Sequence, residues 1–166
     1  MRVVVMGVTG SGKSTVGRML ADRVKATFAD ADDFHSTEAI EKMSRDIPLT
    51  DDDRWPWLER IGSWLAEHDD SVVACSALTR EYRDVITMHA PETLFIHLYA
   101  AQRVLEDRVR RRSKDTGHFA GAGLLDSQYR DLVPLGPDER GASIDISQYT
   151  PAGAVLIART AIDAAF

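Results

Sequence analysis

The stretch Gly7-Val8-Thr9-Gly10-Ser11-Gly12-Lys13-Ser14 matches the pattern G-x-x-x-x-G-K-S/T at every fixed position. The apolar run Arg2–Met6 before it predicts a buried strand, and Lys13–Lys25 after it has the apolar spacing of a helix. In this setting the glycines let successive backbone N–H groups point at one anion, and the helix N-terminus adds about half a positive charge. The stretch therefore predicts a loop that binds the phosphates of a nucleoside triphosphate.

Two side chains of this loop have expected roles of their own. Lys13 can reach the β- and γ-phosphates, and the Ser14 hydroxyl can be a ligand of Mg²⁺. A nucleoside triphosphate and Mg²⁺ are thus the expected partners of the loop. The residues that we expect to contact the nucleotide here are Gly7, Val8, Thr9, Gly10, Ser11, Gly12, Lys13, Ser14 and Thr15.

The rest of the chain alternates short apolar runs with longer amphipathic segments, which is typical of a parallel sheet covered by helices on both faces. Its 166 residues suit a single domain of the α/β class. Beyond the first strand and helix, the predicted strands are Thr27–Asp30, Ser71–Cys75, Leu94–Tyr99 and Ser143–Ile146. The predicted helices are Thr37–Arg45, Asp51–His68, Thr79–Met88, Gln102–Arg112, Leu124–Leu132 and Pro151–Ala165.

Composition excludes some classes of function. The net charge of −6 argues against non-specific binding to nucleic acid or to an anionic membrane, because both need a basic face. The apolar run Val3–Met6 is too short to span a bilayer, and we expect no signal peptide before the fold. The single cysteine, Cys75, follows the apolar run Val72–Ala74 and is expected to be a buried thiol. We expect a cytoplasmic protein.

Two carboxylates close the second predicted strand. Asp30 and Asp32 fall on the same side of an extended segment, and ligands of open parallel sheets bind beyond the carboxyl ends of the strands. A phosphoryl transferase needs one carboxylate near Mg²⁺ and gains from another that takes the proton of the acceptor hydroxyl. We therefore assign Asp30 to the metal, together with Ser14, and Asp32 to catalysis as the general base.

Basic residues suggest where anionic groups bind. Arg54 lies in the first turn of a predicted helix, and its planar guanidinium suits a substrate carboxylate. Arg108 and Arg112 share a helix face, and in P-loop kinases such a basic segment can close over the phosphates. An arginine that stabilises the transferring phosphoryl group is worth roughly 10³-fold or more. We expect both to contact the nucleotide, with Arg112 as the catalytic candidate and Arg108 as the alternative. The stretch Ser113–Gly123 predicts a mobile loop, within a lid of about residues 112–128.

At this point the chain resembles the gluconokinases (gluconate kinases), a family of P-loop small-molecule kinases, over nearly its whole length. The most specific matching segments are P-L-T-D-D-D-R-W-P-W at Pro48–Trp57 and C-S-A-L at Cys75–Leu78. The other matching segments are Met6–Thr15, Asp30–Asp32, Phe34–His35, Glu41–Met43, Tyr82–Asp84, Gly117–Phe119, Leu124–Gln128 and Pro137–Arg140.

The resemblance implies ATP:D-gluconate 6-phosphotransferase activity that requires ATP and Mg²⁺. It implies a three-layer α/β/α fold of the nucleoside-monophosphate-kinase or shikimate-kinase type, with a five-stranded parallel sheet, a mobile lid and a homodimer. It also extends the site. Arg54 and Arg83 are expected to hold the gluconate carboxylate, Asp32, His35 and Ser76 to bind its hydroxyls, and His118 to face the site from the lid.

Two other functions remain open at this stage. A kinase of another small hydroxylated acid, such as shikimate or another sugar acid, would use the same carboxylates and Arg54. A nucleotide-dependent switch would need a guanine-reading Asn-Lys-x-Asp segment, and the chain contains no asparagine. Asp138–Gly141 matches a D-x-x-G switch element, but it lies too near the C-terminus and precedes a strand.

Overall fold

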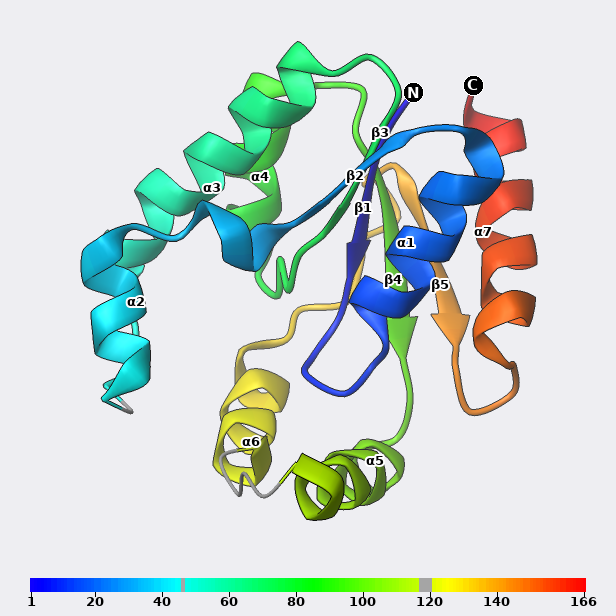
Figure 1. The fold of residues 1–166 in the computed structure, drawn as a ribbon. Coiled ribbons are helices and arrows are strands. Elements are labelled where there is room, and N and C mark those ends of the chain that lie inside the picture. Colours follow the sequence, from blue (N-terminus) through cyan, green and yellow to red (C-terminus); the bar gives the residue numbers. More distant parts are fainter. Residues whose placement is uncertain (46, 117–120) are drawn as a thin grey trace.

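The protein is built on a five-stranded parallel sheet with the strand order β2-β3-β1-β4-β5 (Figure 1). The computed structural model describes the backbone of residues 1–45, 47–116 and 121–166, and their side chains except within 112–122. The parallel α/β sheet predicted from the sequence is confirmed. The strands are β1 (Arg2–Met6), β2 (Thr27–Asp30), β3 (Ser71–Ala74), β4 (Leu94–Tyr99) and β5 (Gly141–Asp145).

Helices cover both faces of this sheet, and Figure 1 shows α5 and α6 beyond the carboxyl ends of the strands. α1 and α7 pack on one face, and α3 and α4 pack on the other. The helices are α1 (Lys13–Val24), α2 (Thr37–Ser44), α3 (Asp51–Glu67), α4 (Arg80–His89), α5 (Gln102–Thr116), α6 (Gly121–Asp131) and α7 (Pro151–Ala165). A short 3₁₀ helix, η1 (Ala31–Phe34), follows β2.

Strand β1 lies in the middle of the sheet and separates two hydrophobic cores. Val3 and Val5 pack with α1 and α7, whereas Val4 and Met6 pack with α3 and α4. Neighbouring residues of a strand point to opposite faces, so an unbroken apolar run is what a strand covered on both faces requires. The buried strand thereby fixes the loop that follows Met6 at the sheet's carboxyl edge.

The expected loop Ser113–Gly123 is shorter than predicted. α5 continues to Thr116 and α6 begins at Gly121, so the predicted loop was wrong at both of its ends. The sequence Arg-Arg-Ser-Lys at 111–114 explains the longer α5, because arginine and lysine are good helix formers. Residues 117–120, which include His118, lie outside the described residues.

Cys75 directly follows β3 and is buried, as predicted. Burial raises the pKa of its thiol to about 12, so the group is neutral at physiological pH. Among the helices described, none combines the length and the apolar character needed to cross a membrane.

Candidate active site

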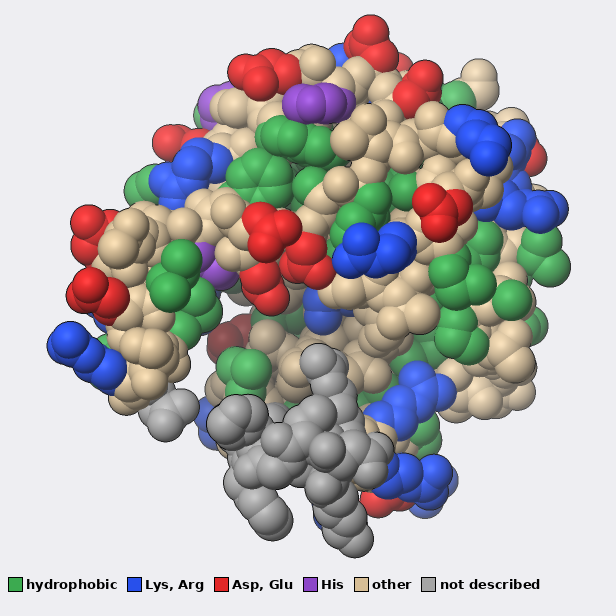
Figure 2. Space-filling view, viewed as in Figure 1, with side chains coloured by type: hydrophobic (Ala, Val, Ile, Leu, Met, Phe, Trp, Pro, Cys, Tyr) green, Lys and Arg blue, Asp and Glu red, His purple; other side chains and the backbone are tan. Residues whose placement is uncertain are grey.

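A cavity of about 580 Å³ opens beside the phosphate loop, where β1, β2 and β3 end. Figure 2 shows the molecule hollowed between α2 and the end that carries α5 and α6, with acidic side chains gathered near the hollow. The loop forms one wall and the segments after β2 and β3 form another. α5 and α6 close the third side. The cavity therefore lies where ligands of open parallel sheets bind.

The glycines of the loop are required by its backbone geometry. Gly7 has φ = 144°, and a Cβ atom there would lie 2.5 Å from the carbonyl oxygen of Leu98. Gly10 and Gly12 have φ of 77° and 89°, in the region that favours glycine. Lys13 Nζ lies 3.0 Å from the Val8 carbonyl oxygen, so the ammonium curls back over the loop. This is the arrangement that a phosphate-binding loop needs.

The turn after β2 holds Asp30 and Asp32 against the loop. The Ser14 hydroxyl donates a 2.6 Å hydrogen bond to Asp30 Oδ2, while Asp30 Oδ1 accepts from the Asp32 backbone N–H at 3.2 Å. The buried Trp57 indole N–H donates to the Ala31 carbonyl at 2.7 Å and ties η1 to α3. Because the three contacts act on consecutive residues, they fix the turn that carries the two carboxylates at the cavity's edge.

Asp32 faces the cavity and has a perturbed acidity. Desolvation by the surrounding walls, and then the Asp30 charge, raise the pKa of Asp32, while His35 and Lys13 act in the opposite direction. Its side chain is nevertheless 88% exposed, so water still solvates the carboxylate and limits the shift. The Asp32 carboxyl is thus open to a substrate, and a general base needs that access.

His35 and Arg54 lie behind the acidic turn; neither is among the residues that line the cavity in the described part of the chain. The His35 ring stacks on Trp57 with centroids 4.7 Å apart, and its Nε2 is 3.9 Å from Asp32 Oδ1. Burial lowers the pKa of His35, which favours the neutral imidazole. The Arg54 guanidinium contacts Tyr82 Oη at 3.2 Å and Asp51 Oδ1 at 3.4 Å and stays partly exposed. Ser76, in contrast, lines the cavity.

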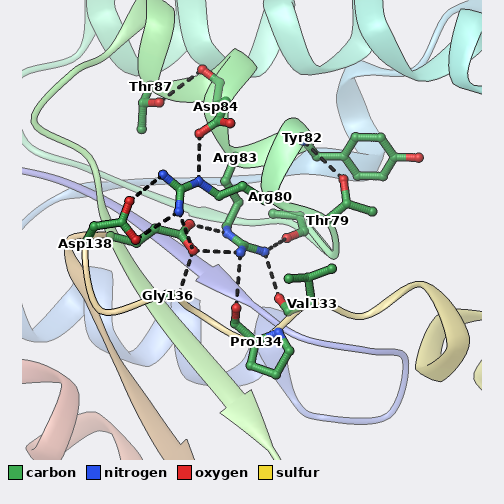
Figure 3. A network of polar contacts seen from close by, with 12 residues as sticks. Thr79, Arg80, Tyr82, Arg83, Asp84, Thr87, Val133, Pro134, Gly136 and Asp138 are labelled. Atoms are coloured by element: carbon green, nitrogen blue, oxygen red, sulfur yellow. Dashed lines mark hydrogen bonds and ion pairs between the residues drawn. The ribbon is translucent and has the colours of Figure 1, made fainter.

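The structure contradicts the expected role of Arg83. Its side chain is 1% exposed and pairs with Glu139, with Nη2 2.8 Å from Oε2 (Figure 3). Nη1 also donates to the carbonyl oxygens of Ala77, Leu78 and Val133 at 3.1, 3.2 and 3.1 Å. The guanidinium is saturated by these acceptors inside the protein and is not available for a gluconate carboxylate.

Arg108 connects the main cavity to a smaller one of about 160 Å³. The smaller cavity lies between the start of α1 and the start of α7, and Arg108 Nη2 donates to the Ile146 carbonyl at 3.0 Å. The side chain of Arg112, the other expected arginine, lies outside the described residues, as does His118. Their roles stay predictions.

Leu124 and Gln128 were expected only as part of a lid of about residues 112–128, and their contribution to the wall of the cavity was not predicted. Leu124 and Gln128 both line it, and Gln128 Oε1 accepts a 2.6 Å hydrogen bond from the Thr9 backbone N–H. Both residues belong to a segment that resembles the gluconokinases, so a signal was present. The resemblance gave these two residues no role in the site, because the position of α6 over the loop depends on tertiary packing.

This fold and this loop define a P-loop kinase of the shikimate-kinase-like class. The family model described as shikimate kinase matches residues 9–123. The crystal structure of shikimate kinase from Aquifex aeolicus, at 15% identity, shares the fold with a TM-score of 0.60 over 99% of this chain and 97% of that one.

Much closer relatives identify the family. A probable gluconokinase of Xenopus tropicalis is 40% identical over 89% of this chain and 86% of that protein. The thermosensitive gluconokinase of Escherichia coli K12 is 38% identical over 87% of this chain and 78% of that protein. The crystal structure of a gluconokinase from Sinorhizobium meliloti 1021 is 41% identical, with a TM-score of 0.88 over 98% and 91% of the two chains. The chain belongs to the gluconokinase family.

Proposed function

We propose that this protein transfers the γ-phosphoryl group of ATP to the 6-hydroxyl of D-gluconate, giving 6-phospho-D-gluconate and ADP. The observation that carries the proposal is one cavity in which Asp32 and Ser76 face the phosphate loop and Lys13. The acceptor and the donor would thus meet between a carboxylate and a loop built for phosphates. Membership of the gluconokinase family supports the choice of acceptor.

The phosphate loop would hold ATP through its backbone N–H groups, with Lys13 on the β- and γ-phosphates. The adenosine part would extend toward the smaller cavity at Arg108, which adjoins the loop through Ser11, Gly12 and Thr15. As the 6-oxygen attacks phosphorus, Asp32 would take the hydroxyl proton, and the bond to the leaving ADP oxygen would break. Catalysis would then rest on positioning and on charge stabilisation.

Ser14 and Asp30 are the residues that would hold Mg²⁺. Their oxygens are in contact at 2.6 Å, and hydroxyl and carboxylate oxygens are the ligands that Mg²⁺ prefers. Sites in kinases commonly use one or two such ligands and take the remainder from phosphates and water. When bound, the ion would neutralise charge on the β- and γ-phosphate oxygens.

Arg54 is our candidate for the gluconate carboxylate, and His35 and Ser76 for its hydroxyls. Arg54 is held by Asp51 and Tyr82 but remains partly exposed. Arg112 and His118 would reach the site from a lid of about residues 112–128, with Arg112 on the transferring phosphoryl group. We also propose that the protein is a cytoplasmic homodimer, and sedimentation of the purified protein tests the dimer.

A panel of acceptors tests the substrate. With ATP and Mg²⁺, gluconate should give turnover well above background, and shikimate and other sugar acids should give less. Shikimate belongs in the panel because the matching family model is described as shikimate kinase. Turnover of another acid with none on gluconate would contradict the proposal.

Replacing Asp32 by asparagine should lower kcat by about 10²- to 10⁴-fold, since a general base contributes about that much. KM for ATP should change little, because the phosphate loop is untouched. Below neutral pH the wild-type rate should fall as Asp32 becomes protonated, in a range above its ordinary pKa of 3.8, and the Asn variant should lack this limb. Steady-state kinetics across pH measure both effects.

The control is Asp33→Asn, which changes an exposed carboxylate in the same short helix. It should keep kcat close to that of the wild type. If Asp32→Asn retained a kcat within about threefold of wild type, Asp32 would not be the base.

A further inference from the structure

Gln128 joins α6 to the phosphate loop through a single short contact. Its Oε1 accepts a 2.6 Å hydrogen bond from the backbone N–H of Thr9, the third residue of the loop. The side chain also lines the 580 Å³ cavity. A residue distant in sequence therefore touches the same loop that would carry the phosphates of ATP.

The position of Gln128 is fixed by contacts on either side of it. Tyr129 Oη donates to the Ala100 carbonyl at 2.8 Å, and Gln102 Nε2 donates to Asp126 Oδ1 at 2.6 Å. Beyond the helix, the Val133 N–H donates to the Leu78 carbonyl at 2.8 Å. These bonds attach α6 to the end of β4, to α5 and to the loop after β3. Gln128 consequently meets Thr9 from a helix that is held in register.

The chemistry of the Gln128 side-chain amide determines what its NH₂ group can bind. A backbone N–H is only a donor, so the atom that meets Thr9 must be the side-chain oxygen. The NH₂ group of Gln128 then has two donors, and no described residue accepts a hydrogen bond from it. Because the amide lines the cavity, these donors are available to an oxygen of a bound ligand.

The walls of the cavity have opposite chemical character. Asp30 and Asp32 on the β2 side are acceptors, whereas Lys13, Arg108 and Gln128 supply donors from the loop, α5 and α6. A phosphoryl group in transfer carries negative charge on its outer oxygens and needs donors around it. Gln128 supplies one such hydrogen-bond donor from α6, on the wall of the cavity opposite Asp30 and Asp32.

We propose that Gln128 is a positioning residue for phosphoryl transfer: its oxygen holds the Thr9 amide, and its NH₂ group donates to an oxygen of the bound substrates. This rests on the proposed kinase function and adds a residue to it. Hydrogen bonds to charged groups are roughly twice as strong as neutral ones, so the donor matters most when phosphate charge is present.

Two substitutions test the proposal. Gln128→Glu keeps an oxygen for Thr9 but replaces the donor with an anion near neutral pH, and Gln128→Met keeps the length and removes both polar groups. At pH 8 each should lower kcat about 10- to 100-fold, the loss expected when a hydrogen bond to a charged group is removed. Thermal unfolding of both variants shows whether the fold is kept.

The pH dependence separates positioning from a merely structural role. A protonated carboxylic acid has both an acceptor oxygen and a donor O–H, as the amide does. The ratio of Gln128→Glu kcat to wild-type kcat should therefore rise by up to tenfold per pH unit as pH falls toward the glutamic acid pKa. The Gln128→Met ratio should stay flat. Asp32 titrates in all three proteins, and an added anion in the cavity that raised the pKa of Asp32 would lower the Gln128→Glu ratio as pH falls, opposite to the rise expected here.

A pH-independent Gln128→Glu ratio, or kcat values for both variants within twofold of wild type at pH 8, would overturn the proposal. The same assay contains the wild type with gluconate, and lack of that turnover would count instead against the proposed function. If another acceptor proved active, the ratios would be measured with it.

Discussion

Replacing Lys13 by alanine is expected to lower kcat by at least about 10²- to 10³-fold, the usual loss when one preorganised donor to transition-state charge is removed. The Lys13 ammonium lies over the phosphate loop, 3.0 Å from the Val8 carbonyl oxygen, where the β- and γ-phosphates would bind. Charge on the transferring group is greatest in the transition state, so kcat should fall more than KM for ATP rises. Steady-state kinetics at saturating Mg²⁺ measure both.

Lys13→Arg provides the matched control for charge alone. Arginine keeps the positive charge, but its planar fork cannot replace a compact ammonium curled against Val8. We expect it to recover only a minor part of the lost kcat. A Lys13→Ala enzyme within tenfold of the wild-type kcat would contradict the role given to this lysine.

Replacing Arg83 by methionine is expected to lower the free energy of unfolding by about 3–5 kcal/mol, the cost of breaking a buried ion pair from one side. Burial, the largest single influence, raises the pKa of Glu139, but the hydrogen bonds from Arg83 and Gly136 and the charges of Arg83 and Arg80 together lower it. Without Arg83 that charge would remain buried, and the carbonyls of Ala77, Leu78 and Val133 would lose a donor. In a chain of this size, Tm should fall by roughly 6–20 °C.

Arg80→Met is the control on the same helix. Arg80 pairs with Asp138 at 2.8 Å in the same network, but its side chain is 40% exposed (Figure 3). Exposed pairs contribute about 0–1 kcal/mol, so this variant should lose little stability. Urea unfolding measures the free energy of unfolding of Arg83→Met and Arg80→Met against that of the wild type. Equal losses in the free energy of unfolding for the two variants would contradict the idea that the burial of Arg83 makes its ion pair more important for stability.

The strands and the phosphate loop were predictable because their signals are local. An apolar run such as Val3–Met6 must be buried on both faces, and the glycines at 7, 10 and 12 are needed for a backbone that other residues avoid. The end of α5 was less predictable. Glycine, serine and alanine suggested a loop from Ser113, but the helix continues to Thr116, as the helix propensity of arginine and lysine favours.

The carboxylates of the site were predictable for a topological reason. Asp30 and Asp32 close a strand of a parallel sheet, and the strand ends of such a sheet meet at one edge. How close they lie to the loop depends on the strand order, in which β3 lies between β2 and β1, and this order came from the structure.

Arg83 and Gln128 could not be placed in this way. Whether an arginine faces a substrate or the interior depends on what packs over it, and here that is the segment around Glu139, far along the chain. Likewise the contact of Gln128 with Thr9 exists only because α6 folds back over the loop. Sequence patterns identify such residues as parts of a motif but do not show the direction in which they point.

The burial of Cys75 has a practical consequence for spectroscopy. It is the chain's one cysteine, it is 1% exposed, and the pKa of its thiol is about 12, so reagents that attack thiolates find almost nothing to modify at neutral pH. Cysteines introduced elsewhere in the chain can thus be labelled without first replacing Cys75. Glu41→Cys on α2 and Arg130→Cys on α6, both at exposed positions, would carry a pair of spin labels. The distance between these labels, with and without ATP and gluconate, would report how the two sides of the site move.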